Sequence, residues 1–196
     1  MNHLIIYANY NDGSFNHAVR DNLESTYRSL GHKVTVRDLY AMQFNPVLTS
    51  DDFEKLRAGH LPDEIIEEQR YIADADVLTF VYPVWWTGMP AILKGYIDRV
   101  FLYGFAYKRG PNGVEGMLQG KKVLLFSSTG NPKKDYEGGM YDAINLTSNT
   151  GIFEYCGITV LDHVYFPSVL SVPEEVRTQY ITDSIVLVKR LFGGTH

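Results

Sequence analysis

Short apolar or alternating runs recur along the chain between longer amphipathic segments. Continuous apolar runs are typical of strands buried on both faces, as in a parallel sheet. The predicted strands are residues 4–8, 33–37, 77–82, 123–126 and 158–165. Between them, apolar side chains recur at spacings near the helical period of 3.6. The predicted helices are residues 15–30, 51–57, 63–73, 91–103 and 173–192, with one broken helix or two short helices over 136–155.

This alternation predicts one α/β domain spanning residues 1–196. Five strands joined by helical crossovers favour a doubly wound parallel sheet in the order 2-1-3-4-5, covered on both faces in three α/β/α layers. Ligands bind such sheets beyond the carboxyl ends of the strands. We therefore expect the loops at residues 9–15, 83–88 and 127–136 to meet at one site.

Composition narrows the classes of function. The chain carries 18 Lys+Arg against 23 Asp+Glu, a formal net charge of −5, which argues against a nucleic-acid partner. The single cysteine, Cys156, excludes an intrachain disulfide and is expected to be a small buried residue. The six histidines show no metal-ligand spacing, so no metal is expected. With no apolar run near the roughly 18 residues of a membrane span and no signal-peptide pattern, we expect a cytoplasmic protein without a membrane span.

The first loop, residues 9–16, contains a single glycine. The dinucleotide fingerprint GxGxxG and the phosphate-binding motif GxxxxGK[ST] are therefore both absent. Ser14 nevertheless stands at the start of a predicted helix, where free backbone N–H groups bind phosphate without a lysine. Two interpretations stay open: Ser14 belongs to a phosphate site, or it only caps the helix.

The second loop, residues 82–90, holds both tryptophans of the chain between two prolines. Adjacent exposed tryptophans are unfavourable in a loop unless something covers them. Neighbouring side chains in an extended segment point in opposite directions, so Trp85 and Trp86 are not expected to lie in the core together. We expect a flat ligand or a partner subunit to cover this loop.

The third loop begins with small residues, Ser127 to Asn131, which let a ligand approach the backbone closely. Lys133 and Lys134 follow; each could attract an anionic cofactor, but a solvated basic turn explains them more simply. The phenol of Tyr136 can donate a hydrogen bond or a proton, or it can serve only in packing.

Motifs of one known family recur in order over residues 4–165. They are Ser14-Phe15-Asn16; Asp38 to Met42 with Phe44-Asn45-Pro46; Gly59-His60-Leu61 with Glu68-Gln69; Pro83 to Gly88 with Pro90 to Gly95; Arg99-Val100-Phe101; Gly104 to Tyr107; Thr129-Gly130; and Cys156-Gly157. With them the chain resembles the flavodoxin-like NAD(P)H:quinone oxidoreductases, the family of mammalian DT-diaphorase and its shorter bacterial relatives. So many ordered matches make chance a poor explanation.

The resemblance implies a flavodoxin-like fold and a tightly bound flavin, FAD or FMN. The resemblance also implies a ping-pong reaction. In this reaction NAD(P)H gives a hydride to the flavin and leaves, and a quinone or similar flat acceptor then takes two electrons. The implied flavin-binding residues are Asn9, Ser14, Phe15, Asn16, Pro83, Val84, Trp85, Trp86, Ser128, Thr129, Gly130 and Asn131. Tyr136 falls on the family's catalytic tyrosine, and Trp86 and Tyr136 are the candidate substrate contacts.

The chain departs from the family pattern at several positions. Asn9 stands where the family often has histidine. Mammalian members pair the tyrosine with a histidine six residues on; Asp142 stands there and is kept as a candidate catalytic residue, although a carboxylate donates no proton at neutral pH unless its pKa is raised. The chain lacks a mammalian insertion between Pro46 and Gly59 that contributes to adenine binding, which makes FMN a real alternative. Asp98 stands at the position from which mammalian members reach the partner's adenine. FAD therefore also stays possible.

The resemblance further implies a homodimer in which the partner closes the flavin site. Trp85, Trp86 and residues 104–107 offer more apolar surface than one flavin ring would cover. Two other functions are alternatives to the quinone reductase. A flavodoxin-type electron carrier is disfavoured by the mild charge, the length of the chain and the missing Thr-rich phosphate loop. A regulatory reductase subunit of a potassium-efflux transporter is not tested by anything in the sequence.

Overall fold

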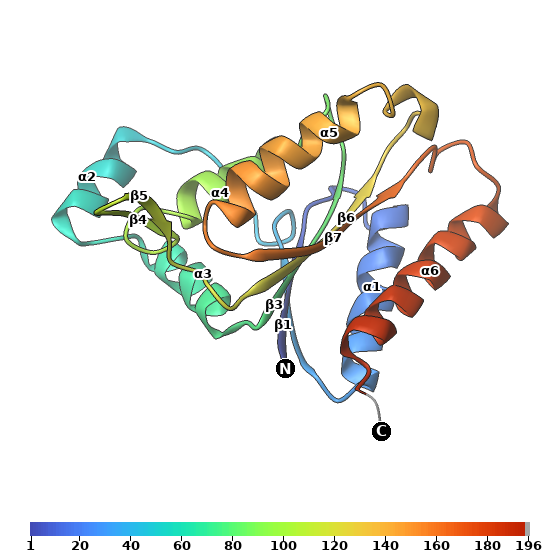
Figure 1. The fold of residues 1–196 in the computed structure, drawn as a ribbon, viewed down its shortest axis with the longest axis horizontal. Coiled ribbons are helices and arrows are strands. Elements are labelled where there is room, and N and C mark those ends of the chain that lie inside the picture. Colours follow the sequence, from blue (N-terminus) through green and yellow to red (C-terminus); the bar gives the residue numbers. More distant parts are fainter. Residues whose placement is uncertain (195–196) are drawn as a thin grey trace.

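The computed structural model describes residues 1–194, in which a five-stranded sheet lies between two layers of helices (Figure 1). The strands of the sheet are β1 (Asn2–Tyr7), β2 (Lys33–Asp38), β3 (Val77–Pro83), β6 (Lys122–Ser128) and β7 (Thr159–Phe166). All neighbours pair in parallel in the order β2-β1-β3-β6-β7. This is the predicted order 2-1-3-4-5, so the predicted fold class is confirmed.

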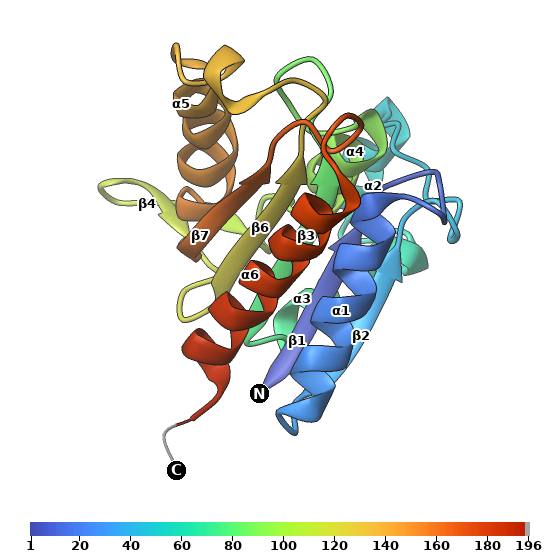
Figure 2. The ribbon, with the colours of Figure 1, turned by 90° about the vertical axis from the view of Figure 1, so that its right-hand side faces the viewer.

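Helices cover both faces of the sheet (Figure 2). On one face, α1 (Phe15–Ser29) packs beside α6 (Glu174–Phe192). On the other face lie α3 (Asp63–Asp74), α4 (Ala91–Val100) and the π-helix η2 (Asn145–Glu154), and α2 (Ser50–Ala58) lies at the outer end of this layer. Each face therefore has its own hydrophobic core.

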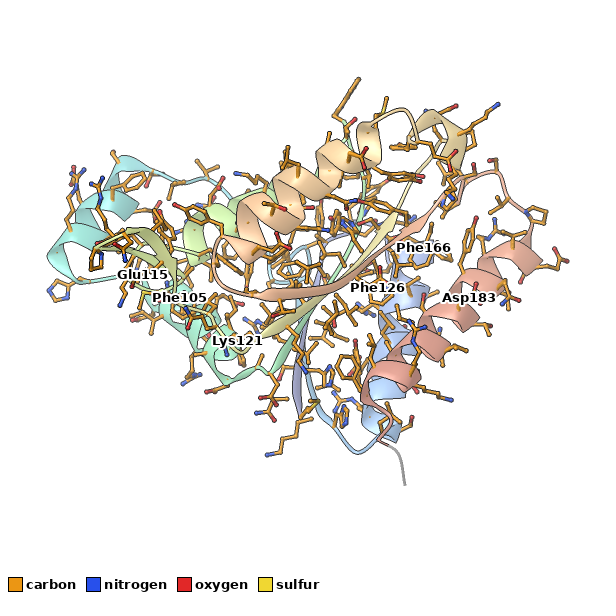
Figure 3. All side chains as sticks on the ribbon, viewed as in Figure 1. Phe105, Glu115, Lys121, Phe126, Phe166 and Asp183 are labelled. Atoms are coloured by element: carbon orange, nitrogen blue, oxygen red, sulfur yellow. The ribbon has the colours of Figure 1, made fainter. Side chains whose placement is uncertain are left out.

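Burial on both faces explains the continuous apolar runs of the inner strands. Alternate side chains of β1, β3 and β6 enter the two cores in turn. Phe126 of β6 and Phe166 of β7, labelled in Figure 3, lie on the α1–α6 side with ring centroids 6.2 Å apart. A sheet of this kind leaves only the loops at the strand ends free for function.

One predicted helix is too long, and one hairpin was not predicted. The helix expected over 91–103 ends at Val100, and the chain then turns through Gly104, whose φ is 88°. It continues into the antiparallel pair β4 (Tyr107–Gly110) and β5 (Gly113–Gly116). These strands are four residues long and rich in glycine and charge, so they lack the apolar alternation by which strands are predicted.

The segment expected to form one broken helix or two short helices contains three helical forms. A short 3₁₀ turn, η1 (Lys133–Asp135), precedes α5 (Met140–Ile144), which continues directly into η2. Hydroxyls in this region bond to backbone carbonyls four residues back: Thr147 Oγ1 donates to Ala143 O at 2.9 Å, and Ser148 Oγ to Ile144 O at 2.6 Å. Such back-bonding competes with the regular helical pattern.

A buried arginine joins α4 to α2 and α3. Arg99 is 5% exposed, and its Nη2 donates to Asp52 Oδ1 at 2.9 Å. Its Nη1 donates to Glu64 Oε1 and to the carbonyl of Asn45, both at 2.8 Å. The guanidinium thus connects α4 to the region of residues 45–64, which lies 35 to 54 residues earlier in the chain.

Three composition-based expectations can be compared with residues 1–194. No helix there has the length and apolar character needed to cross a bilayer. Nor do three or more His, Cys, Asp or Glu side chains gather there in a group that could hold a metal ion. Cys156 is buried, as expected, and burial raises the pKa of its thiol to about 11.

Candidate active site

A pocket of about 790 Å³ opens at the carboxyl ends of the strands, where the three loops were expected to meet. Its wall includes Asn9, Ser14, Phe15 and Asn16 from the first loop, Pro83, Val84 and Trp85 from the second, and Ser128, Thr129 and Gly130 from the third. The structure therefore brings these ten candidate residues together. The other candidates, Trp86, Asn131, Tyr136 and Asp142, are not part of this wall.

The first loop orders the start of α1. Asn9 Oδ1 accepts a hydrogen bond from Asn11 N at 3.0 Å. Ser14 Oγ accepts from His17 N at 3.2 Å and lies 3.3 Å from Tyr7 Oη. Ser14 is thus the helix cap, as one of the two interpretations held. Because it also lines the pocket, capping does not remove it from the site.

Asn16 indicates what the pocket can hold. Its side chain is 2% exposed and lines the pocket, yet its Nδ2 has no hydrogen-bond partner among residues 1–194. An unsatisfied buried donor costs about 1–3 kcal/mol, so such groups are rare without a reason. The first backbone N–H groups of the 15-residue helix α1 also lack intrahelical partners. Together these donors fit an anionic group such as a phosphate.

The second loop is a tight turn from Trp85 to Gly88. Each of these residues donates its N–H to the other's carbonyl at 3.0 Å. Trp86 and Thr87 between them have φ of 50° and 58°, as a type I′ turn requires. Holding residues other than glycine in this region costs about 1–3 kcal/mol each, a cost typical of functional sites.

The turn directs the two indoles to different places. Trp85 is 40% exposed, lines the pocket, and lies with its ring centroid 6.2 Å from that of Tyr10. Trp86 is fully exposed. Neither tryptophan is in the core, which agrees with the expectation that they are not buried together.

The candidate residues in and after the third loop differ in how far they are buried. Thr129 lines the pocket, and its Oγ1 donates to the carbonyl of Asn131 at 3.0 Å. Tyr136 directly follows η1 and is half-buried, and in the part of the chain that the structure describes its hydroxyl makes no hydrogen bond. Asp142 is exposed on α5. The catalytic roles of Tyr136 and Asp142 stay predictions.

One wall of the pocket was not predicted from the sequence. It is formed by the segment before α6 and the first turns of that helix, with Val169, Leu170, Glu174, Arg177, Thr178 and Ile181. Arg177 Nη1 donates to the carbonyl of Val172 at 2.8 Å, which holds the guanidinium beside the pocket. The carboxyl end of β7 opens at the same edge as the other strands, so the predicted topology already implied a fourth loop here.

A second cavity, of about 720 Å³, lies on the side of the sheet covered by α4 and η2. Its wall is largely apolar and includes Phe101, Leu102, Tyr107, Ile144, Ile152 and Tyr155. Two aromatic wall residues remain open to solvent, Phe53 at 44% and Tyr155 at 45% exposure. Its wall also contains polar side chains, but these have partners: Lys94 pairs with Asp98 at 2.6 Å, and the hydroxyls of Thr147 and Ser148 donate to backbone carbonyls. Within residues 1–194, no unpartnered buried donor like that of Asn16 lines this cavity.

A buried polar network connects the sheet to η2. His163 Nε2 lies 2.9 Å from Ser127 Oγ, and its Nδ1 lies 3.1 Å from both Asn149 Oδ1 and Tyr165 Oη. Tyr165 Oη donates to Asn145 Oδ1 at 2.9 Å. Because an amide oxygen only accepts, we assign the proton of His163 to Nδ1, and Nε2 then accepts from Ser127. Burial lowers the pKa of His163 to about 3, so the ring is neutral.

We expect the free energy of unfolding to decrease as the pH is lowered below about 6, and His163 is one cause of this decrease. Its pKa is about 3 in the fold and about 6.5 in an unfolded chain, so between these values only the unfolded chain binds the proton. Stability from this group is complete above pH 6.5 and decreases by about 1.4 kcal/mol per pH unit below it. Urea unfolding at pH 7, 6 and 5 measures the slope.

The variant His163→Gln should reduce that slope by about one proton, even if it lowers stability at every pH. His60→Gln, which changes an exposed histidine, is the matched control and should leave the slope nearly unchanged. Equal slopes for His163→Gln and the wild-type chain would show that His163 is protonated in the fold.

Comparisons with known proteins agree with the geometry. A family model described as a flavodoxin-like fold matches residues 1–183. Over 183 residues the chain is 39% identical to the uncharacterized NAD(P)H oxidoreductase of Haemophilus influenzae, covering 92% of this chain and 91% of that protein. Over 199 residues it is 31% identical to NAD(P)H dehydrogenase (quinone) 1 of Rattus norvegicus, covering 91% and 73% of the two chains. The chain belongs to the flavodoxin-like NAD(P)H:quinone oxidoreductase family.

Solved structures support the same assignment for this quinone oxidoreductase family member. The NAD(P)H:quinone oxidoreductase from Methanothermobacter marburgensis matches it with a TM-score of 0.88 and 25% identity, over 97% of this chain and 98% of that one. An FMN-dependent NADH-azoreductase from Bacillus anthracis shares the fold, with a TM-score of 0.74 at 20% identity over 97% and 99% of the chains. The resemblance stated from sequence motifs is thereby confirmed.

Proposed function

We propose that this chain is a cytoplasmic, flavin-dependent NAD(P)H:quinone oxidoreductase that reduces quinones or similar flat acceptors by two electrons. The observation that carries the proposal is the unpartnered Nδ2 of Asn16 beside the free N–H groups of α1, in a pocket whose other wall is the strained turn at Trp85. A bound flavin would supply the redox chemistry, taking up a hydride and passing both electrons to the acceptor.

The residues of the pocket divide into two groups by their chemistry. Ser14, Phe15 and Asn16 at the start of α1 would hold the flavin phosphate through backbone and side-chain N–H groups. Asn9, the segment 83–86 and the segment 128–131 would hold the ring system, with backbone groups at its polar edge. Either FMN or FAD is compatible with this division, and mass analysis of the flavin released on denaturation distinguishes them.

Tyr136 and Trp86 would act on the substrate side. The Tyr136 hydroxyl is free to donate a hydrogen bond, and a donor aimed at developing negative charge stabilises it most in a site that excludes water. The indole of Trp86, exposed at the tip of the turn, would contact the nicotinamide and the acceptor in turn. NADH or NADPH as donor, and Asp142 as a participant, are tested by steady-state kinetics.

Purified protein should show a flavin absorbance spectrum that bleaches anaerobically with NADH or NADPH and returns on addition of a quinone. A chain that binds flavin but is not reduced by either nicotinamide would instead be an electron carrier. Asn16→Ala should raise the dissociation constant for flavin about 10- to 150-fold, since one hydrogen bond to a charged group is worth about 1.5–3 kcal/mol. Fluorescence titration of apoprotein measures it.

Asn22→Ala is the matched control for this titration. Asn22 lies on the same helix, and its Nδ2 donates to the carbonyl of Ala18 at 2.8 Å rather than facing the pocket. It should therefore bind flavin as the wild-type chain does. If Asn16→Ala leaves the flavin affinity unchanged, Asn16 does not contact the phosphate.

The proposal includes a homodimer formed over the second cavity. Phe53, Tyr103 and Tyr155 are 44–52% exposed near this largely apolar cavity, and such surface usually marks an interface. Sedimentation at micromolar concentration should give twice the chain mass of 22.3 kDa. Tyr155→Glu should yield monomer, whereas Val186→Glu, at an exposed apolar position on α6, should not. A wild-type monomer would contradict the dimer.

A further inference from the structure

A continuous stack of four rings leads from Tyr136 into the sheet. The ring centroids of Tyr136 and Tyr141 are 5.1 Å apart, those of Tyr141 and Tyr165 are 4.2 Å apart, and those of Tyr165 and His163 are 4.2 Å apart. Successive planes differ by 23°, 41° and 21°. The stack therefore connects the candidate catalytic tyrosine to the buried network of β7 and η2.

Side-chain hydrogen bonds hold the inner end of the stack, whereas the outer end, at Tyr136, is not held in this way. His163 and Tyr165 are held by hydrogen bonds to Ser127, Asn145 and Asn149. The hydroxyl of Tyr136 makes no such hydrogen bond to any residue among 1–194. Its ring stacks on the ring of Tyr141, whose N–H also donates to the carbonyl of Tyr136 at 3.1 Å.

Tyr141 takes part through its ring and not through its hydroxyl. That hydroxyl is buried and has no hydrogen bond of normal length among residues 1–194. The neighbouring hydroxyl of Thr129 already donates to the carbonyl of Asn131. Burial, followed by the nearby Tyr136 and Glu137, raises the pKa of Tyr141, so its phenol stays neutral.

We infer that Tyr141 is a positioning residue: its ring transmits the fixed geometry of β7 and η2 to the ring of Tyr136, at the end of the third loop that lines the flavin pocket. The kinetic consequence rests on the proposed function, but the placement of the ring does not. Small displacements of a catalytic group cost large factors in rate, so loss of the stack should be visible in turnover.

The placement is tested without flavin. Apoprotein carrying 3-fluorotyrosine only at residue 136 should give one ¹⁹F resonance with a small solvent-isotope shift, as expected for a half-buried ring. Tyr141→Leu should move this resonance toward that of free fluorotyrosine and increase the isotope shift. Tyr141→Phe, which keeps the ring, should restore the wild-type signal. An unchanged signal in Tyr141→Leu would overturn the inference.

The kinetic role is tested by a double-mutant cycle on the rate of flavin reduction. Tyr141→Leu should slow this step about 5- to 20-fold in the wild-type background and less than about twofold when Tyr136→Phe is already present, because neighbouring groups that act together are not additive. Tyr141→Phe should stay within about twofold of wild type. Tyr71→Leu, a half-buried tyrosine on α3, is the control for general loss of packing.

The outcomes separate the two proposals. Equal slowing by Tyr141→Leu in both backgrounds would overturn the positioning role, even in an active quinone reductase. A wild-type chain that binds no flavin would refute the proposed function, while the ¹⁹F measurement would still decide whether Tyr141 holds Tyr136 in place.

Discussion

Replacing Tyr136 with phenylalanine is expected to slow reduction of the bound flavin by NAD(P)H about 5- to 150-fold. The hydroxyl of this half-buried ring makes no hydrogen bond within residues 1–194, so it is free to donate to a ligand. Losing one hydrogen bond to developing charge costs about 1–3 kcal/mol, which gives that range of rates. Anaerobic stopped-flow absorbance at the flavin band measures the reductive step directly.

The matched control keeps the same chemical change away from the pocket. In Tyr71→Phe the lost hydroxyl belongs to an α3 tyrosine that donates to Glu67 at 3.1 Å on the surface. This variant should reduce its flavin at the wild-type rate, and Tyr136→Phe should retain its flavin during purification. If Tyr136→Phe is reduced at the wild-type rate, Tyr136 serves only in packing.

Replacing Arg99 with alanine is expected to lower the free energy of unfolding by about 3–5 kcal/mol. The substitution leaves Asp52 buried without its cation, and it removes the donors to Glu64 and to the carbonyl of Asn45. Removing one partner of a buried ion pair is strongly destabilising because the remaining charge stays desolvated. Denaturant unfolding at pH 7 measures the loss, and thermal unfolding should show a decrease of about 6–20 °C.

The same helix offers the control. Lys94 pairs with Asp98 one turn on at 2.6 Å, but both side chains are more than one-third exposed. Exposed pairs of this kind contribute less than about 1 kcal/mol, so Lys94→Ala should change stability only slightly. A loss in Arg99→Ala no greater than that in Lys94→Ala would mean that Arg99 contributes no more than a surface charge.

The central sheet was predictable because the burial of each inner strand leaves a pattern in the sequence of that strand alone. The central residues of strands β1, β3 and β6 are buried on both faces, so their side chains are almost all apolar, and each apolar run is visible in the sequence. The hairpin β4–β5 was not predictable, since its residues are determined by contacts with parts of the chain that are distant in the sequence. Gly116, for example, lies so close to the backbone of Cys156 that a Cβ atom would come within 2.3 Å of it.

The pocket was predictable to the extent that topology determines which loops meet. Parallel strands bring their carboxyl ends to one edge, and that rule located the loops beginning at Asn9, Pro83 and Ser127. It applies equally to β7, but the run after that strand shows no recognisable motif, and the wall around Arg177 was missed. The strain at Trp86 and Thr87 could not be anticipated, because neither residue is typical of a left-handed turn.

The environment of Cys156 has a consequence for a protein that handles electrophiles. Quinones alkylate thiols by conjugate addition, and the thiolate is the reacting species. A thiol pKa of about 11 leaves only about one molecule in ten thousand as thiolate at pH 7, and the residue is 3% exposed. The only cysteine of the chain is thereby kept from reacting with the compounds that the pocket is proposed to reduce. We therefore expect that turnover does not inactivate the protein by arylation of this thiol.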